Sequence, residues 1–346
     1  MKRHLLFLAA LLIVNLAASA QKKFSVYAVG FYNQENLFDT CHDEGKKDYE
    51  YLPNKGWNGM KYTNKLRNMS KALADMGTDV LPNVGCAFIG LSEVENHKVL
   101  DALVDQAPLK ARNMKYVHIE GPDRRGIDCA LLYNPSLFSV KNVKLLPYVQ
   151  ELAKDSAFFT RGFLTVRGEM AGDDVAVIVC HWPSRFSGPF YRESAARQVK
   201  VIKDSLLNVN QEMKIFVMGD MNDDPVNKSM HVYLQAKPEI SQVGAGDMYN
   251  PWYNVLAKEG KGTLFYSGNW NLFDQIVITP NLLNKDAKKK DYSSLKYWKS
   301  HIFRRDYLIQ QEGQYKGAPL RTTAGGRWLN GYSDHLPVVM YLVKEK

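Results

Sequence analysis

Residues 214–224 read KIFVMGDMNDD, in which an apolar, strand-like run ends in a string of acids and an amide. Residues 333–340 read SDHLPVVM, in which the polar string comes first and the apolar run follows. Polar side chains at the ends of strands are held rigidly yet meet solvent, and carboxylates gathered there need a cation or a shared proton to relieve their repulsion. The two stretches therefore predict a catalytic site at strand ends, with metal-assisted hydrolysis as the leading chemistry.

The rest of the chain mixes strand-like and helical patterns. Short apolar runs predict strands, and apolar residues at helical spacing predict helices. The expected strands are 24–31, 86–91, 116–119, 127–133, 161–167, 175–180, 215–218, 273–278 and 336–342, and the expected helices are 64–76, 98–104 and 191–207. Because no Pro/Ser-rich linker interrupts this pattern, we expect one α/β domain over residues 21–346, a sandwich of packed sheets with outer helices.

Residues 284–330 carry many Lys, Arg, Tyr and Trp residues without a clean period. Such a segment is either a binding loop, whose basic and aromatic residues grip a phosphate backbone and stack bases, or a solvated decoration. We favour the decoration, because ordinary surface loops share this composition.

The first twenty residues have the features of a cleaved export signal. Lys2 and Arg3 precede an apolar stretch that ends in a small-residue cleavage site at residues 18–20. We expect the mature chain to begin at Gln21 and to be periplasmic or extracellular. Stable membrane insertion is not expected, since no later apolar run reaches about 18 residues.

Charge and cysteine content restrict the function only loosely. The formal net charge of the 346-residue chain is +9, and it falls to +7 without the two basic residues of the signal, which leaves 43 basic and 36 acidic residues. This permits polyanionic partners without requiring them. Cys41, Cys86, Cys129 and Cys180 either pair as two disulfides or remain buried thiols. No CxxC or HExxH string is present, which argues against a structural or peptidase-type zinc site.

Further polar groups lie at the edges of other expected strands. These groups are the string NQEN at 33–36, Glu93, His181 and Asp274. Since side chains alternate between the faces of a strand, edge positions of neighbouring strands can converge in one pocket.

Together these strings resemble the endonuclease/exonuclease/phosphatase superfamily, which includes deoxyribonuclease I, AP endonucleases, sphingomyelinases and inositol-polyphosphate 5-phosphatases. The ordered motifs are Asn33-x-Glu35, Ser92-Glu93, His181, Gly219-Asp220-x-Asn222, Asp274 and Ser333-Asp334-His335. The resemblance covers nearly all of 24–346. It implies a four-layered α/β/β/α sandwich and divalent-metal-dependent hydrolysis of a phosphoester.

By this resemblance, Glu93 would be the principal metal-binding carboxylate, assisted by Glu35 and Asp334, with Asn33 near the metal and the substrate phosphate. A lone glutamate after a strand is more often a plain surface residue, so the whole constellation carries this assignment. Hard oxygen ligands suit Mg²⁺, with Mn²⁺ or Ca²⁺ as alternatives. Such an ion neutralises phosphate charge and stabilises the leaving oxygen.

The resemblance also assigns the acid–base groups. Asp274 would orient His335, whose imidazole either takes a proton from the attacking water or stabilises the transition state as imidazolium. Asp220 competes with His335 for the role of base, and the choice stays open. Asn222 would donate to a phosphate oxygen.

His181 resembles the histidine that contacts phosphate or protonates the leaving group in the deoxyribonuclease, sphingomyelinase and 5-phosphatase branches. AP endonucleases commonly carry tyrosine there, which argues against abasic-site repair. Arg161 and Arg185 are the expected phosphate contacts. The basic residues of one expected helix are interpreted as a solvated face: Arg192, Arg197, Lys200 and Lys203. Five further histidines match no motif and are interpreted as ordinary: His42, His97, His118, His231 and His301. Asp128 is interpreted as a structural acid.

The sequence thus predicts an exported, monomeric, Mg²⁺-dependent phosphoester hydrolase that works by in-line attack of water. A deoxyribonuclease-I-like endonuclease or phosphodiesterase acting on nucleic acid is the first expectation. A sphingomyelinase-like or inositol-phosphate-type activity on a lipid or small organic phosphate is the alternative, because one fold hosts all of these. A non-catalytic binding protein on the same fold is third, and the intact motifs argue against it.

Overall fold

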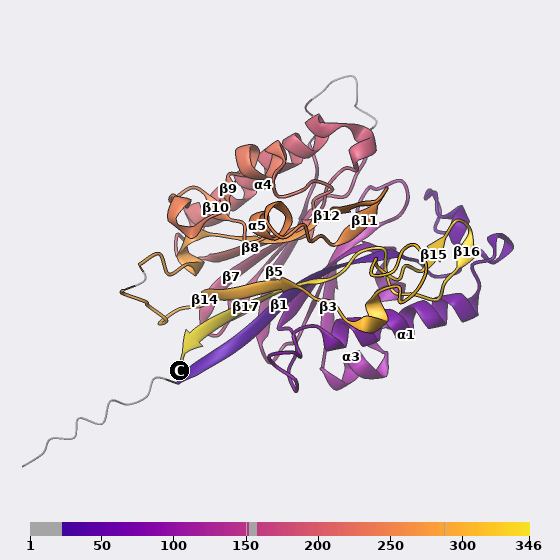
Figure 1. The fold of residues 1–346 in the computed structure, drawn as a ribbon, viewed down its shortest axis with the longest axis horizontal. Coiled ribbons are helices and arrows are strands. Elements are labelled where there is room, and N and C mark those ends of the chain that lie inside the picture. The colour runs from indigo at the N-terminus through magenta and orange to yellow at the C-terminus, as the bar shows by residue number, and fades with distance from the viewer. Residues whose placement is uncertain (1–22, 150, 152–157, 287) are drawn as a thin grey trace, which may run out of the picture.

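The computed structural model describes residues 23–149, 151, 158–286 and 288–346. The expected signal peptide and its cleavage site lie outside the described residues. Two large mixed β-sheets stack face to face, with α4 on one outer side and α1 and α3 on the other (Figure 1).

The first sheet has six strands. Their order across the sheet is β14 (Lys296–Ile302), β17 (Val338–Glu345), β1 (Phe24–Leu37), β2 (Phe88–Val94), β4 (Asp128–Tyr133) and β3 (Lys115–His118). Its outer face packs on α1 (Gly59–Asp75), α2 (His97–Val104) and α3 (Ala107–Ala111).

The second sheet has seven strands. Their order is β5 (Phe138–Leu146), β6 (Phe163–Met170), β7 (Asp173–His181), β8 (Lys214–Asp220), β13 (Asp274–Ile278), β10 (Met248–Tyr249) and β9 (Ala236–Lys237). Its outer face packs on α4 (Pro189–Val209). Smaller elements complete the described chain: α5 (Tyr253–Ala257), the hairpin β11 (Leu264–Tyr266) and β12 (Asn269–Asn271), and the hairpin β15 (Thr323–Ala324) and β16 (Arg327–Trp328).

Three apolar layers hold these elements together. The largest lies between the sheets, where Phe88 of β2 meets Phe138 and Phe216 at ring-centroid distances of 5.1 and 5.5 Å. The two others lie between each sheet and its helices. The predicted four-layered α/β/β/α sandwich is confirmed.

The strand predicted from residues 215–218 is a central strand of the second sheet. β8 runs parallel to β7 and antiparallel to β13, and every residue from Lys214 to Asp220 is buried. A continuous apolar run is typical of a strand covered on both faces. A Cβ at Gly219 would lie 2.2 Å from the carbonyl oxygen of Cys180, so the strand pairing requires glycine there.

Several elements differ from the expectation. The interpretation of residues 284–330 as a solvated decoration is wrong for β14, which pairs with β17 at the edge of the first sheet. Its sequence, KYWKSHI, lacks the apolar pattern from which the other strands were predicted, because an edge strand can carry exposed charged residues. Helix α1 starts five residues before the predicted range, because the Asn58 Oδ1 atom accepts from the Lys61 amide at 3.1 Å and caps the helix.

The basic face of α4 is only partly solvated, which corrects the prediction for two of its four cations. The Arg192 Nε atom lies 2.9 Å from Asp223, and the side chain is buried. Lys203 is also buried, and its ammonium group donates to the Gly246 carbonyl at 2.7 Å and pairs with Asp204.

All four cysteines are free thiols, with Cys41 exposed and Cys86, Cys129 and Cys180 buried. Asp128 begins β4 and accepts from His118 Nε2 and from the Gly121 amide, each at 3.0 Å, as a structural acid would. Within the described ranges, no helix is both long and apolar enough to cross a membrane.

Candidate active site

Cross-strand register brings three of the predicted side chains into one row of the second sheet. His181 at the end of β7 is paired with Asp220 at the end of β8, and Asp220 is paired with Asp274 at the start of β13. His335 reaches this row from a bridge beside β11, and its Nδ1 lies 2.7 Å from Asp274 Oδ2. The predicted Asp274–His335 pair is therefore present in the structure.

Asp220 lies at the centre of this arrangement. Its Oδ2 accepts from the Asn33 side-chain amide of the first sheet at 3.0 Å, and its Oδ1 accepts from the Asn222 backbone amide at 2.9 Å. Oδ2 is also 3.6 Å from His181 Nε2 and 3.8 Å from His335 Nε2. A single carboxylate thus connects both sheets and faces two imidazoles.

The first sheet presents its acids on irregular backbone. The β2–β4 pairing shifts register between Ser92 and Val94, so Glu93 is the extra residue of a β-bulge. Glu93 has φ 59°, and Glu35 and Asn222 also have positive φ, at 45° and 49°. Non-glycine residues rarely adopt this conformation, and strained positions cluster at functional sites.

The two predicted metal ligands near the chain ends are joined by a residue that the sequence analysis missed. Arg321 places Nε 3.2 Å from Glu35 Oε1 and Nη2 3.1 Å from Asp334 Oδ2. The other oxygen of Glu35 accepts from the Thr322 amide at 2.6 Å. Arg321 belongs to the irregular basic segment and is 286 residues away from Glu35 in sequence, so local patterns contain no signal for this contact.

Burial and neighbouring charges shift the acid–base groups of the site. Burial raises the pKa of Asp220 to about 6, and burial with the charge of Asp334 raises the pKa of Glu35 to about 7. Burial disfavours a charged His335, but Asp274 and Asp220 outweigh it and raise the pKa of His335 well above its usual value. Burial and the charge of Arg161 hold the pKa of His181 well below its usual value.

A cavity of about 260 Å³ opens over this cluster. Its lining comprises Glu93, Arg125, Phe158, Phe159, Thr160, Arg161, His181, Pro183, Ser184, Ser187, Asp220, Asn222 and His335. Three residues that line the cavity have a buried side-chain atom with no hydrogen-bond partner among the described residues, namely Thr160 Oγ1, Arg161 Nε and His181 Nδ1. A buried polar atom without a partner is costly unless a ligand completes it.

The predicted phosphate-binding arginines differ in position. Arg161 lines the cavity, where its Nη1 and Nη2 donate to Asp123 and to the Trp182 carbonyl, each at 3.0 Å. Arg185 lies outside the residues that line the cavity, and its Nη2 pairs with Asp224 at 2.8 Å. Arg125, which the sequence analysis missed, lines the cavity with Nη2 3.9 Å from Glu93 Oε2.

The acidic residues fit a hard divalent cation in chemistry, although they do not form a finished cage. Among the described residues, no three His, Cys, Asp or Glu side chains converge as ready ligands. Glu93 Oε1 and Asp334 Oδ1 accept no hydrogen bond from any described residue, and the ring nitrogens of His181 and His335 lie 3.9 and 4.0 Å from them. Mg²⁺ is usually held by one or two carboxylates with substrate oxygens and water, so these two oxygens suffice for the fit.

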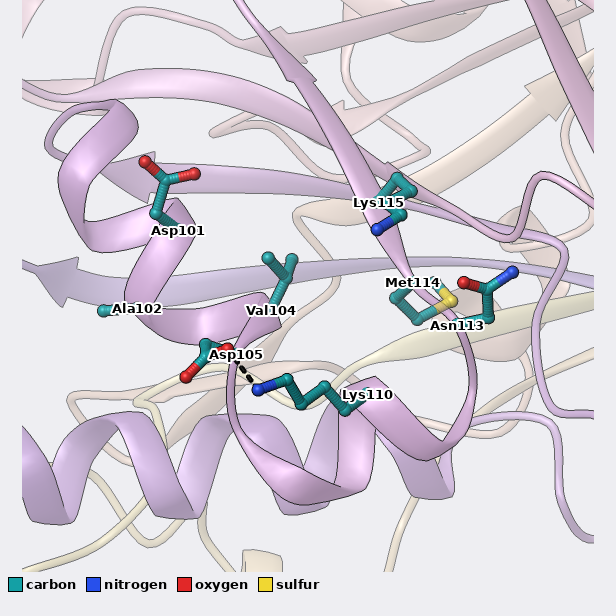
Figure 2. A pocket seen from close by; sticks show the side chains of 8 residues that line it. All are labelled: Asp101, Ala102, Val104, Asp105, Lys110, Asn113, Met114 and Lys115. Atoms are coloured by element: carbon teal, nitrogen blue, oxygen red, sulfur yellow. Dashed lines mark ion pairs between the residues drawn. The ribbon is translucent and has the colours of Figure 1, made fainter.

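A second hollow of about 520 Å³ lies between α2, α3 and β3 (Figure 2). Asp105 and Lys110 pair across it at 2.5 Å. None of the predicted site residues lines it. This hollow is therefore separate from the row of site residues around Asp220.

A face-to-face pair of mixed sheets with acids, amides and imidazoles at one end defines the sandwich class that deoxyribonuclease I exemplifies. The sequence matches the model of the Endonuclease/Exonuclease/phosphatase family over residues 28–344, and the chain belongs to this family.

Solved structures show the same fold at low sequence identity. D. rerio TDP2 complexed with single-strand DNA product superposes with a TM-score of 0.53 and 11% identity over 92% of this chain and 99% of that chain. The mannosyl-6-phosphatase Bt3783 of Bacteroides thetaiotaomicron has a TM-score of 0.54 and 14% identity, over 91% and 99% of the two chains. A family protein from the same organism has a TM-score of 0.54 and 14% identity, over 94% and 97%. No curated protein matches the sequence.

Proposed function

We propose that the chain is an exported, Mg²⁺-dependent phosphoester hydrolase, and that it cleaves phosphodiesters of nucleic acid by in-line attack of water. The observation that carries the reaction class is the position of Asp220, which lies between two imidazoles and is hydrogen-bonded to Asn33 of the opposite sheet. Family membership supports the phosphoester chemistry.

The acid–base work is assigned to Asp220 and His335. The Asp274 carboxylate fixes the ring of His335 through Nδ1, so Nε2 is the nitrogen that faces Asp220. A water near both groups would give its proton to this pair while its oxygen attacks phosphorus. The ester oxygen on the far side of phosphorus leaves and takes up a proton from solvent, and the neutral imidazole of His181 would donate a hydrogen bond to the phosphate.

Glu93 and Asp334 are the residues that would hold a divalent cation, with Glu35 beside them. When bound, such an ion supplies neutralisation of phosphate charge and stabilisation of the leaving oxygen. The side-chain amide of Asn33 donates a hydrogen bond to Asp220 and fixes its carboxylate. The backbone amide of Asn36 donates to Glu93 Oε2 at 2.9 Å and fixes that carboxylate.

The walls of the cavity support a phosphodiester with a base attached. Arg161 and Thr160 offer unpartnered buried donors to phosphate oxygens. Phe159 lines the same cavity and exposes about half of its surface, and the Arg124 guanidinium lies 5.4 Å from the centre of its ring. An exposed aromatic ring with an arginine beside it is the combination that stacks nucleic-acid bases. The TDP2 structure with a DNA product, on the same fold, adds support.

The test is hydrolysis by the purified protein with Mg²⁺, Mn²⁺ or EDTA. The substrates are supercoiled DNA, single-stranded DNA, RNA, sphingomyelin, inositol phosphates, a sugar phosphate and a bis-aryl phosphodiester. We expect metal-stimulated cleavage that is fastest on nucleic acid and abolished by EDTA. Turnover confined to sphingomyelin or to phosphomonoesters would show that nucleic acid is not the substrate. No metal-stimulated turnover on any substrate of the panel would refute the proposed function.

A further inference from the structure

Arg321 contacts two of the three carboxylates that the family resemblance assigns to metal binding. Its Nε and Nη2 lie 3.2 Å from Glu35 and 3.1 Å from Asp334. Glu93 also contributes to the electrostatic stabilisation of the charged guanidinium. The guanidinium therefore supplies a fixed positive charge inside the acidic cluster, because arginine keeps its proton in proteins.

Buried contacts fix the position of Arg321. Its neighbour Thr322 is buried, donates its amide to Glu35 at 2.6 Å and accepts from Lys65 Nζ at 2.6 Å. Lys65 is fully buried in α1 and also donates to the Tyr332 carbonyl at 2.5 Å. Asn68, one turn further along the helix, donates to the carbonyls of residues 330 and 331 at 2.9 Å each. The segment is thus attached to α1 directly after Arg321, at Thr322, and again at residues 330–332.

The Arg321 guanidinium bridges the carboxylates of Glu35 and Asp334, which is a position that a second divalent ion could occupy in its absence. Two-metal phosphoesterases use shared carboxylates between ions about 3.5–4 Å apart. In this chain the guanidinium of Arg321 contacts Glu35 Oε1 and Asp334 Oδ2, while no described residue donates a hydrogen bond to Glu93 Oε1 or Asp334 Oδ1.

We propose that Arg321 takes the place of a second divalent cation, so that the site binds one metal ion per chain. This inference rests on the proposed metal dependence. It adds that Glu35 acts through Arg321, as a positioning residue for Asp334.

The test is direct binding of Mn²⁺ to the full chain, without substrate, by titration calorimetry and by electron paramagnetic resonance of free Mn²⁺. The wild type is expected to bind one ion. Arg321→Gln removes the charge between Glu35 and Asp334, so we expect it to bind a second Mn²⁺ at least about tenfold more tightly than the wild type does. Arg321→Lys retains the charge and should keep one ion.

Arg327→Gln is the matched control. Arg327 is an exposed arginine of the same segment, and no carboxylate pairs with it in the described part of the chain. Its substitution should leave the number of bound ions and their affinity unchanged.

Thermal unfolding gives a second readout. Arg321→Gln leaves two acids without their counter-charge, so it should melt below the wild type in EDTA and gain more from added Mn²⁺. Two ions of similar affinity in the wild type would overturn the inference without touching the proposed function, even if the variant fails to fold. Equal stoichiometry and affinity in the wild type and Arg321→Gln would also overturn it. No Mn²⁺ binding by the wild type would overturn both.

Discussion

At the residue scale, a single buried carboxylate orients the imidazole of His335. Asp274 is the one carboxylate within hydrogen-bond distance of His335 Nδ1 in the described structure, at 2.7 Å, and its side chain is fully buried. A ring held in this way cannot turn its nitrogens away from the cavity. The contribution of Asp274 is therefore orientation, and it should appear in the rate of the chemical step.

Asp274→Asn should lower kcat by at least about tenfold and change KM little, because an amide cannot hold the same imidazole tautomer and charge. Steady-state kinetics on the best substrate of the panel give both constants. Asp79→Asn is the matched control, since Asp79 pairs with His301 at 3.2 Å away from the site and should leave kcat unchanged. If the kcat of Asp274→Asn is close to that of the wild type, Asp274 does not contribute to catalysis.

At the element scale, α1 supports the active site through buried polar contacts. Lys65 donates to the Thr322 hydroxyl and the Tyr332 carbonyl, and the adjacent residues Arg321 and Ser333 contact Glu35 and Asn33. Helix and site are therefore parts of one hydrogen-bonded unit.

Lys65→Met should destabilise the protein by about 1–3 kcal/mol, since the Thr322 hydroxyl and the Tyr332 carbonyl lose a buried charged donor and the carbonyl keeps only the Thr322 hydroxyl at 3.2 Å. Urea unfolding followed by circular dichroism measures this free energy. Arg67→Met, at an exposed position of the same helix, should stay within about 0.5 kcal/mol of the wild type. Equal midpoints for the two variants would show that the lysine contacts contribute nothing.

The reactivity of the four cysteine thiols should follow their burial. Burial raises the pKa of the Cys86, Cys129 and Cys180 thiols, that of Cys180 to about 12, whereas Cys41 is exposed. Because the thiolate is the reactive form, the native protein should react with one equivalent of a thiol reagent and the unfolded protein with four. Fewer than four under non-reducing denaturing conditions would reveal a disulfide.

Central strands such as β7 and β8 could be predicted from the sequence, whereas of the four edge strands only β3 was predicted, and β5, β9 and β14 were missed. The runs before Gly219 and Cys180 are continuously apolar because both faces of β8 and β7 are covered, and that signal is local. β14 exposes Trp298 and Lys299, so its pattern resembles a loop. The motifs indicated Asp220, Asp274 and His335 as one site, but no pattern connected Arg321 to Glu35, because only the tertiary fold joins them.

At the scale of the whole molecule, the two sheets behave as one body if the layer between them is continuous. Phe88 from the first sheet packs between Phe138 and Phe216 of the second. The site is composed of both sheets, since Asn33 and Glu93 come from one and Asp220 and His181 from the other. Loss of packing between the sheets should therefore affect stability and activity together.

Phe88→Ala should cost about 3–5 kcal/mol of unfolding free energy, the usual range for a buried phenylalanine. Far-ultraviolet circular dichroism and activity should be lost in the same denaturant transition. Phe186→Ala, at a fully exposed ring, should change stability by less than about 0.5 kcal/mol. Two separate transitions in the Phe88 variant would show that the sheets unfold independently.

If Asp220 and His335 activate the water that attacks phosphorus, their loss must slow the chemical step. The measurement is kcat/KM for Mg²⁺-dependent cleavage of a bis-aryl phosphodiester by His335→Ala and Asp220→Asn, with His301→Ala as the control histidine. We expect a loss of at least about a hundredfold in each site variant and none in the control. Near-normal rates in both site variants, with their folds intact, would contradict it.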